Sequence, residues 1–255
     1  MRCIEKELAG GVLTITLVDE ANRNALSDTL KSELGDAIDT ANSDPAVRVV
    51  VLTNKGKTFC AGADLKRKAN PDSQQPVLSA ADLFAKIKNS PKPFVGKIAG
   101  HCIAGGVGLA AALDISIAAE DTLFGFTEVR IGVSPAIISV LCLPKLRAAD
   151  AREAFLRGNR FDATEAQRMG LINRAAPRSG LDDAVHEVVR DLIAGGPDAI
   201  ANTKQVLNRV PYMEFAPALA WATELSASLF GSDEAREGIA AYREKRKTSW
   251  NTNDE

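Results

Sequence analysis

Residues 94–132 hold the side chains of this chain that are best placed to do chemistry. A strand-like run at 94–99 leads into a glycine-rich turn at 100–108, and Glu128 follows a later apolar approach. Glycines at a strand-to-helix turn let another molecule approach the backbone, and the first amides of a helix have no internal partner. A carboxylate in apolar sequence is a candidate proton carrier. The stretch predicts backbone amides combined with one acid–base residue; the alternative is a buried turn with a paired glutamate.

A second glycine-bearing turn occurs earlier in the chain. Residues 47–53 are β-branched and apolar, which predicts a buried strand, and the turn that contains Gly62 follows them. Residues 47–66 and 94–113 share the order strand, glycine-bearing turn, helix start, with the second helix expected to begin near Leu109. Parallel strands packed side by side place two such turns at one sheet edge. Two amides can then converge on one oxygen atom, which is the geometry of an oxyanion hole.

Other chemistries fit the sequence less well. No G-K-[ST] tripeptide closes a glycine cluster, as a P-loop requires, and no G-x-S-x-G marks a serine nucleophile. Residues 106–111 match the dinucleotide pattern G-x-G-x-x-A, but they lie too far from the end of the preceding strand. His101 and Cys60 each lie at a glycine-bearing turn, where hydrogen-bonded packing is the more common role. The chemistry that still fits these residues is enolate chemistry at a carbonyl or thioester, with one acid–base residue.

Composition narrows the class of protein. The chain has 255 residues and a net charge of −2, which gives no global reason to expect nucleic acid as a partner. Its four scattered cysteines and two histidines favour no metal site and are typical of a reducing compartment. No apolar run is long enough to cross a membrane, and the N-terminus is too charged for a signal peptide. We therefore expect a cytoplasmic protein that binds neither nucleic acid nor membranes.

The periodicity divides the chain into two parts. We predict an α/β core over residues 1–195 and an all-helical region over residues 196–255. The polar, proline-bearing segment 67–76 is predicted to be mobile. Residues 171–175 predict one short strand, and the last helix is expected to run over 233–247.

Four ordered segments resemble the signatures of the enoyl-CoA hydratase/isomerase (crotonase) superfamily. They are FCAGADLK at 59–66, GHCIAGGVGLA at 100–110, FGFTEVRIGVSP at 124–135 and FGSDEAREGIAAYREKRK at 230–247. The resemblance covers nearly the whole chain and implies an α/β fold, a crotonase-like spiral of ββα units followed by a C-terminal helical trimerisation region. It also implies a trimer or a dimer of trimers, an acyl-CoA substrate, and no cofactor beyond the coenzyme A of that substrate.

The resemblance also assigns roles to individual residues. The amides of Ala63 and Gly105 would form the oxyanion hole, and Glu128 would be the acid–base residue. Pro135, Ala136 and Ile137 would shape the acyl pocket. Residues expected to contact coenzyme A are Arg23, Ala25, Ala61, Asp64, Leu65, Lys66, Tyr242 and Lys245, the last two from a neighbouring subunit.

One departure from the family pattern bears on the reaction. Two-carboxylate hydratases carry a second glutamate where this chain has Gly108, so it resembles a single-glutamate member. We expect an enoyl-CoA hydratase that adds water to a 2-enoyl-CoA. A Δ3,Δ2-enoyl-CoA isomerase that uses Glu128 alone is the alternative, and a non-catalytic CoA-binding or scaffold protein is the further one.

Overall fold

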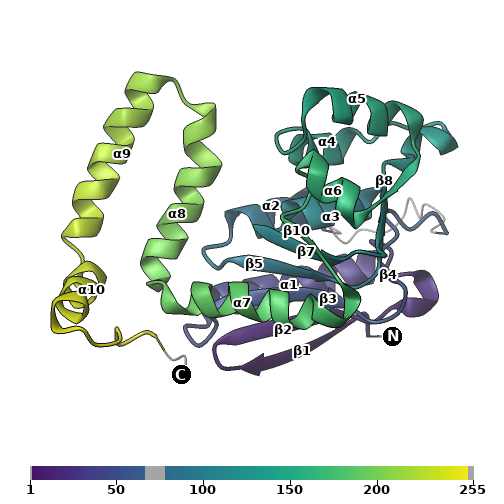
Figure 1. Ribbon diagram of the computed structural model, residues 1–255. Coiled ribbons are helices and arrows are strands. Elements are labelled where there is room, and N and C mark those ends of the chain that lie inside the picture. Colours follow the sequence, from purple (N-terminus) through teal and green to yellow (C-terminus); the bar gives the residue numbers. More distant parts are fainter. Residues whose placement is uncertain (1, 67–77, 252–255) are drawn as a thin grey trace.

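Two β-sheets form the centre of the computed structural model, which describes residues 2–66 and 78–251. The larger sheet has the order β1-β2-β3-β5-β7-β10, in which only β1 and β2 are antiparallel (Figure 1). Its strands are β1 Ile4–Ala9, β2 Val12–Leu17, β3 Val49–Asn54, β5 Phe94–Ile98, β7 Ile115–Ala119 and β10 Arg174–Ala176. The segment predicted to be mobile, residues 67–76, lies outside the described residues.

A smaller sheet of three-residue strands carries the chain from the larger sheet into the helices. Its order is β4-β6-β8-β9, with β4 Thr58–Cys60, β6 His101–Ile103, β8 Leu123–Gly125 and β9 Arg160–Asp162. The chain therefore repeats a long strand, a short strand and a helical segment, as in β5, β6 and the helix α3 Gly105–Ala112. This confirms the predicted α/β spiral of ββα units. Because β4 and β6 are parallel neighbours, the turns that follow them lie at the same edge.

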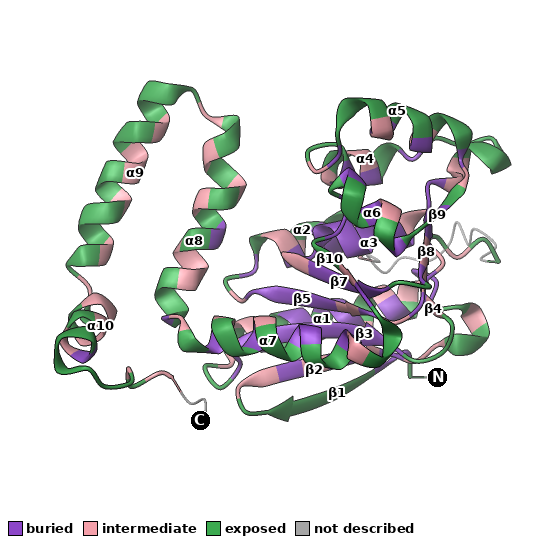
Figure 2. Ribbon diagram, in the orientation of Figure 1, coloured by how far each residue is buried: buried purple, intermediate pink, exposed green. Residues whose placement is uncertain are grey.

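Helices cover both faces of the larger sheet. The remaining helices of the core are α1 Asp28–Ser43, α2 Ala80–Asn89, α4 Ala136–Cys142, α5 Ala148–Arg157, α6 Ala163–Met169 and α7 Leu181–Ala194, with 3-10 turns η1 Glu20–Asn22, η2 Thr127–Ile131 and η3 Arg178–Gly180. One apolar core joins the sheet to α1, α2 and α3, and a second joins the opposite face to α7. All six residues of β3 are buried between these layers (Figure 2).

Three predicted boundaries are wrong, two of them for a local physical reason. Helix α3 begins at Gly105 rather than near Leu109, because the glycines at its start let the helix pack directly against the backbone of Cys60. Strand β10 begins at Arg174 rather than at 171. The last helix, α10 Asp233–Glu244, ends before Lys245 rather than at 247, because Lys245 adopts a left-handed conformation with φ 55°.

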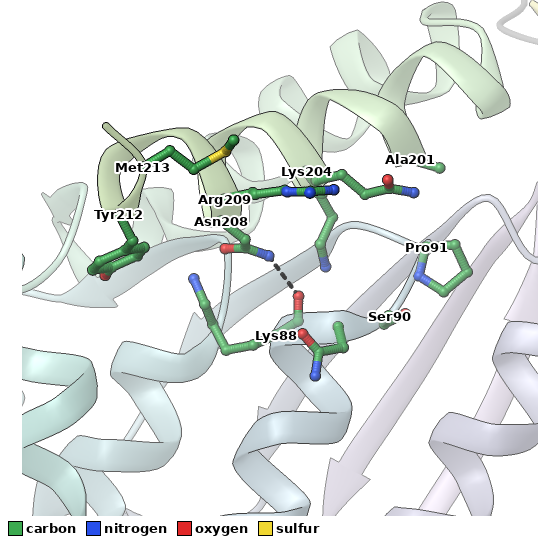
Figure 3. A pocket seen from close by; sticks show the side chains of 11 residues that line it. Lys88, Ser90, Pro91, Ala201, Lys204, Asn208, Arg209, Tyr212 and Met213 are labelled. Carbon is green, nitrogen blue, oxygen red and sulfur yellow. Dashed lines mark hydrogen bonds between the residues drawn. The ribbon is translucent and has the colours of Figure 1, made fainter. Parts of the chain in front are cut away.

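The C-terminal helices leave the core through α8 Pro197–Arg209, which two side chains attach to the C-terminal end of α2. The buried Lys204 ammonium donates to Asp114 Oδ2 (2.7 Å) and to the carbonyl of Lys92 (2.8 Å). Asn208 Nδ2 donates to the Lys88 carbonyl at 2.8 Å, as Figure 3 shows. The Asn208 contact satisfies a carbonyl that the end of α2 leaves unpaired, and the Lys204 contacts tie α8 to the segments that follow α2 and α3.

Beyond α8, the helix α9 Phe215–Phe230 extends away from both sheets (Figure 1), after the short turn η4 Val210–Tyr212. It contains no buried residue even though its sequence is strongly apolar. The division into a core over 1–195 and an oligomerisation region over 196–255 stays a prediction. None of the helices in the described ranges is long and apolar enough to cross a lipid bilayer.

Candidate active site

A cavity of about 570 Å³ opens where the β4 and β6 turns meet η2 and α4. Its walls are mostly apolar, and Glu128 and Lys31 are the charged residues among the lining side chains that the structure describes. The lining residues are Leu26, Lys31, Ala61, Ala63, Leu65, Ala80, Phe84, Ile103, Ala104, Gly105, Thr127, Glu128, Ile131, Val133, Ser134, Pro135, Ala136, Ile137 and Ile138.

Backbone hydrogen bonds connect the first turn of the site to the loop that precedes α1. The Ala61 amide donates to the Arg23 carbonyl at 3.1 Å, and the Leu26 amide donates to the Gly62 carbonyl at 2.7 Å. Gly62 has φ 86°, a left-handed conformation that favours glycine. A side chain at Gly62 would also collide with the amide of Gly105. The two turns therefore approach each other this closely because position 62 has no Cβ.

This approach brings together the amides predicted for the oxyanion hole. Gly105 is the first residue of α3, so its amide has no partner within the helix. The Ala63 nitrogen lies 3.6 Å from the position that a Cβ on Gly105 would occupy. Neither amide donates a hydrogen bond to any residue of the described ranges. Both remain available to an oxygen atom in the cavity.

Ala104 sets the direction of the second turn, and nothing in the sequence pointed to it. Its φ of 52° and ψ of −122° lie in a region that L-residues rarely adopt. The Ala104 amide donates to the Gly125 carbonyl at 2.9 Å, which holds this conformation against the β8 turn. Strained backbone of this kind is common next to functional sites because the surrounding structure must impose it.

Glu128 lies in the first turn of η2, directly after β8, and faces the same cavity. The side chain is half-buried, and its Oε2 atom has no hydrogen-bond partner in the described part of the chain. Burial raises the pKa of this carboxyl above its usual value because the charged form loses hydration. A carboxylate with a free oxygen and a raised pKa is suited to accept and return a proton.

Gly108 lies behind the cavity wall rather than in an empty space. An ideal Cβ at this position would lie 2.9 Å from Ile138 Cβ and 3.3 Å from Phe84 Cε2. Ile138 and Phe84 are both buried, and both line the cavity. Apolar side chains thus fill the volume that a larger residue at 108 would need.

The structure brings together eight of the residues predicted for the site and leaves six outside the cavity wall. Those that line the cavity are Ala61, Ala63, Leu65, Gly105, Glu128, Pro135, Ala136 and Ile137. Asp64 is engaged locally, because its two carboxylate oxygens accept from Asn22 Nδ2 and from the Lys66 amide. Arg23 and Ala25 belong to the loop that supports the first turn.

Tyr242 and Lys245 lie far from this cavity within the same chain. Both are on or directly after α10, which Figure 1 places well away from α3 and α4. Tyr242 is 86% exposed. Their predicted role with a neighbouring subunit's ligand stays a prediction.

His101 and Cys60 have packing roles. His101 Nδ1 accepts the Leu123 amide at 3.1 Å, which ties β6 to β8. Burial raises the pKa of the Cys60 thiol to about 12, so the reactive thiolate is absent at neutral pH. Neither residue lines the cavity.

Lys31 and Phe84 line the cavity although sequence reasoning did not single them out. Phe84 follows the apolar face of α2, a pattern that cannot distinguish a core position from a cavity wall. Lys31 lies in α1 beside apolar residues, and a lysine on a helix is most often an exposed charge.

Comparisons with known proteins show which family the chain is similar to. The profile of the family described as "Enoyl-CoA hydratase/isomerase" matches residues 7–253. A candidate enoyl-CoA hydratase of Thermus thermophilus is 33% identical over 243 residues, which cover 93% of this chain and 96% of that protein. The carnitinyl-CoA dehydratase of Escherichia coli K12 is 33% identical over 250 residues, covering 94% of this chain and 95% of its own length.

Solved structures agree in fold as well. An enoyl-CoA hydratase of Mycobacterium smegmatis superposes with a TM-score of 0.89 at 29% identity, covering 99% of this chain and 100% of that one. An enoyl-CoA hydratase/isomerase of Marinobacter aquaeolei gives 0.90 at 30% identity, covering 98% and 100%. The fold and the paired turns define a crotonase-type protein. The chain belongs to the enoyl-CoA hydratase/isomerase family, whose members act on acyl-CoA thioesters.

Proposed function

We propose that this protein is an enoyl-CoA hydratase that adds water to a 2-enoyl-CoA thioester. The observation that carries the proposal is that Ala63, Gly105 and Glu128 line one cavity, and that neither backbone amide donates a hydrogen bond within the described residues. Two amides can hold the thioester oxygen as it gains negative charge, and one carboxylate can move the proton.

The reaction follows from these groups. Glu128 accepts a proton from water, and the hydroxide so formed attacks C3 of the enoyl group. The C2–C3 double bond shifts to C1–C2, so the thioester becomes an enolate whose oxygen accepts hydrogen bonds from Ala63 and Gly105. Glu128 then returns its proton to C2, the thioester re-forms, and the product has gained one water. Removing one donor of this kind typically costs about 10²–10³ in rate.

The names of the relatives support the addition of water over other reactions. Several of them are carnitinyl-CoA dehydratases, and a dehydratase catalyses the reverse of a hydration. Removal and addition of water pass through the same enolate, so the same three groups serve both directions.

A Δ3,Δ2-enoyl-CoA isomerase is the second candidate. The apolar packing of Ile138 and Phe84 against Gly108 favours it, because the wall there offers no second acid to orient water. In this reaction Glu128 removes a proton from C2 and returns it to C4, and the two amides hold the same enolate. A CoA-binding protein without catalysis is the remaining candidate, and retention of CoA binding without turnover would favour it.

The substitution Glu128→Gln tests the catalytic proposal. We expect kcat to fall by about 10²–10⁴ because the amide cannot accept the proton. The enzyme is offered 2-enoyl-CoA and 3-enoyl-CoA, and the products are identified by mass. A gain of one water indicates hydration, whereas an unchanged mass with a moved double bond indicates isomerisation. Undiminished turnover by Glu128→Gln would show that another residue moves the proton.

The proposal extends to the assembly and to its setting. We propose a trimer or a dimer of trimers in which Tyr242 and Lys245 of one subunit contact the coenzyme A bound by another. The 86% exposure of Tyr242 and the absence of buried residues in α9 support this assembly. The four cysteines are buried and are not joined by disulfides, which supports a reducing, cytoplasmic setting.

A further inference from the structure

Lys31 is a charged residue of the cavity wall that the proposed reaction does not use. It belongs to α1, and Ala80 and Phe84 of α2 line the same cavity, whereas Ala63, Gly105 and Glu128 come from the turns and from η2. Only 12% of its side chain is exposed. Lys31 therefore reaches the cavity wall from a different element than the three groups proposed to react.

The position of Lys31 is unfavourable for the helix that carries it. It is the fourth residue of α1, close to the positive end of the helix dipole, where cations are disfavoured. Burial of an ammonium group adds a cost unless partners compensate it. Asp28 Oδ1, 3.1 Å away, is its ion-pair partner in the described ranges, and Asp28 is itself partly exposed. An ammonium group has three hydrogens to donate, so this pair leaves donors available to a ligand.

We propose that Lys31 binds a carboxylate at the far end of the acyl group, so that the preferred substrates are CoA thioesters of dicarboxylic acids. This inference rests on the proposed function, because it assumes that the cavity holds the acyl group. A carboxylate bound by an ammonium group in a largely apolar cavity forms a charge-assisted hydrogen bond that water cannot easily displace. An uncharged acyl chain forms no such hydrogen bond with Lys31 and gains no affinity from it. A cationic acyl group is disfavoured by the like charge.

The competing explanation is that Lys31 contacts the coenzyme A moiety. A contact of that kind would strengthen the binding of every acyl-CoA equally, whereas the proposed contact acts only when the acyl group ends in a carboxylate. The two explanations therefore differ in the preference between two ligands that share the same coenzyme A.

The experiment measures the affinity of glutaryl-CoA and pentanoyl-CoA by calorimetry. These five-carbon thioesters differ at the far end of the acyl group, and neither has a double bond to react. We expect the unmodified protein to bind glutaryl-CoA about tenfold or more tightly than pentanoyl-CoA, as a hydrogen bond to a charged group allows. Lys31→Met should abolish this preference while the affinity for pentanoyl-CoA stays within about twofold. Lys31→Arg should keep most of the preference because it keeps the charge.

Control variants separate the binding effect from damage to the fold. Lys55→Met removes a lysine that pairs with Glu5 outside the cavity, and it should leave both affinities unchanged. If Lys31→Met does not fold, Lys31→Gln supplies the same comparison with a polar side chain.

Two results would overturn the proposal while leaving the proposed function intact. One is equal affinity of the unmodified protein for the two ligands. The other is an equal loss of both affinities in Lys31→Met, which would assign the lysine to coenzyme A. If neither ligand binds, the proposed function fails together with this inference.

Discussion

Because Glu128 is partly buried, we expect a rise in pH to lower the stability of the folded chain and to raise the rate of the reaction. Its pKa in the folded chain lies above the ordinary value of 4.5, so the folded state holds the proton more tightly than the unfolded state. The stability that the neutral form contributes is present below pH 4.5 and is lost as pH rises through the raised pKa. The charged form is the proposed base, so kcat/KM should increase over that same interval.

The prediction is a pH profile of kcat/KM whose acidic inflection lies above 4.5. The profile is measured with 2-enoyl-CoA at saturating and limiting concentrations. Glu128→Gln should lose this inflection, and its unfolding free energy should vary less with pH over the same interval. An inflection that persists in Glu128→Gln would assign the titration to another group.

The contact of Gly108 with Ile138 predicts strong coupling between these two positions. Gly108→Ala should destabilise the protein by about 1–3 kcal/mol because the new methyl group overpacks the wall. Ile138→Ala should cost about 2–5 kcal/mol through the cavity that it leaves. The double variant should cost less than the sum, since each change relieves the other. Urea unfolding measures the three values, and simple additivity would contradict the packing described above.

The sequence indicated some residues of the site better than others. Glu128 was indicated by its position in apolar sequence, whereas the amides of Ala63 and Gly105 were assigned by the resemblance of their turns to the family signatures. Ala104 was not predicted, because its backbone conformation is imposed by the Gly125 carbonyl, which belongs to the next ββα unit. Lys31 was missed for a similar reason, since only the packing of α1 against α2 shows that its side chain faces a cavity.

At the scale of elements, the entry into α3 stores strain that one substitution can release. Ala104→Gly should stabilise the protein by about 1 kcal/mol, because glycine tolerates φ 52° and the strain exceeds the entropy that glycine loses. Ala85→Gly is the matched control at an exposed helical position of α2, where a loss of about 1 kcal/mol is expected. Thermal unfolding of both variants compares them. Destabilisation by Ala104→Gly would mean that the Ala104 side chain contributes more through packing than its backbone costs.

Helices and strands that have a cap residue or a periodic apolar pattern can be predicted from the sequence, and those that have neither cannot. Helix α1 has clear local signals, namely an apolar face and the Ser27 cap, whose side chain accepts the Leu30 amide at 3.2 Å. Strand β1 was missed because five of its six residues are exposed, so they show no alternation. The three-residue strands of the smaller sheet are too short for any periodic pattern. These strands form because the short segments of neighbouring ββα units hydrogen-bond to one another in the smaller sheet.

At the scale of the whole molecule, the apolar surface of α9 predicts self-association. Phe215 is 80% exposed and Leu219 is 57% exposed, and α9 buries no residue against its own chain. Exposed apolar surface of this extent is typical of an interface. The double variant Phe215→Asp with Leu219→Asp should form a smaller assembly than the unmodified protein. Light scattering after gel filtration measures the mass of each.

The double variant Ser226→Asp with Ser228→Asp is the matched control for this experiment. It adds the same two negative charges to α9 at exposed polar positions and should leave the assembly unchanged. A monomeric unmodified protein would contradict the prediction, because the apolar face of α9 would then have no partner of its own kind.

The packing of Ile138 against Gly108 also fixes the order in which this chain could change during evolution. An acid at position 108 needs the volume that Ile138 occupies, so a smaller residue at 138 must come first. In the opposite order, the lineage would pass through an intermediate with an overpacked wall. A library that varies only position 108 should therefore return few folded acidic variants. A library that varies positions 108 and 138 together should return acids at 108 paired with glycine or alanine at 138.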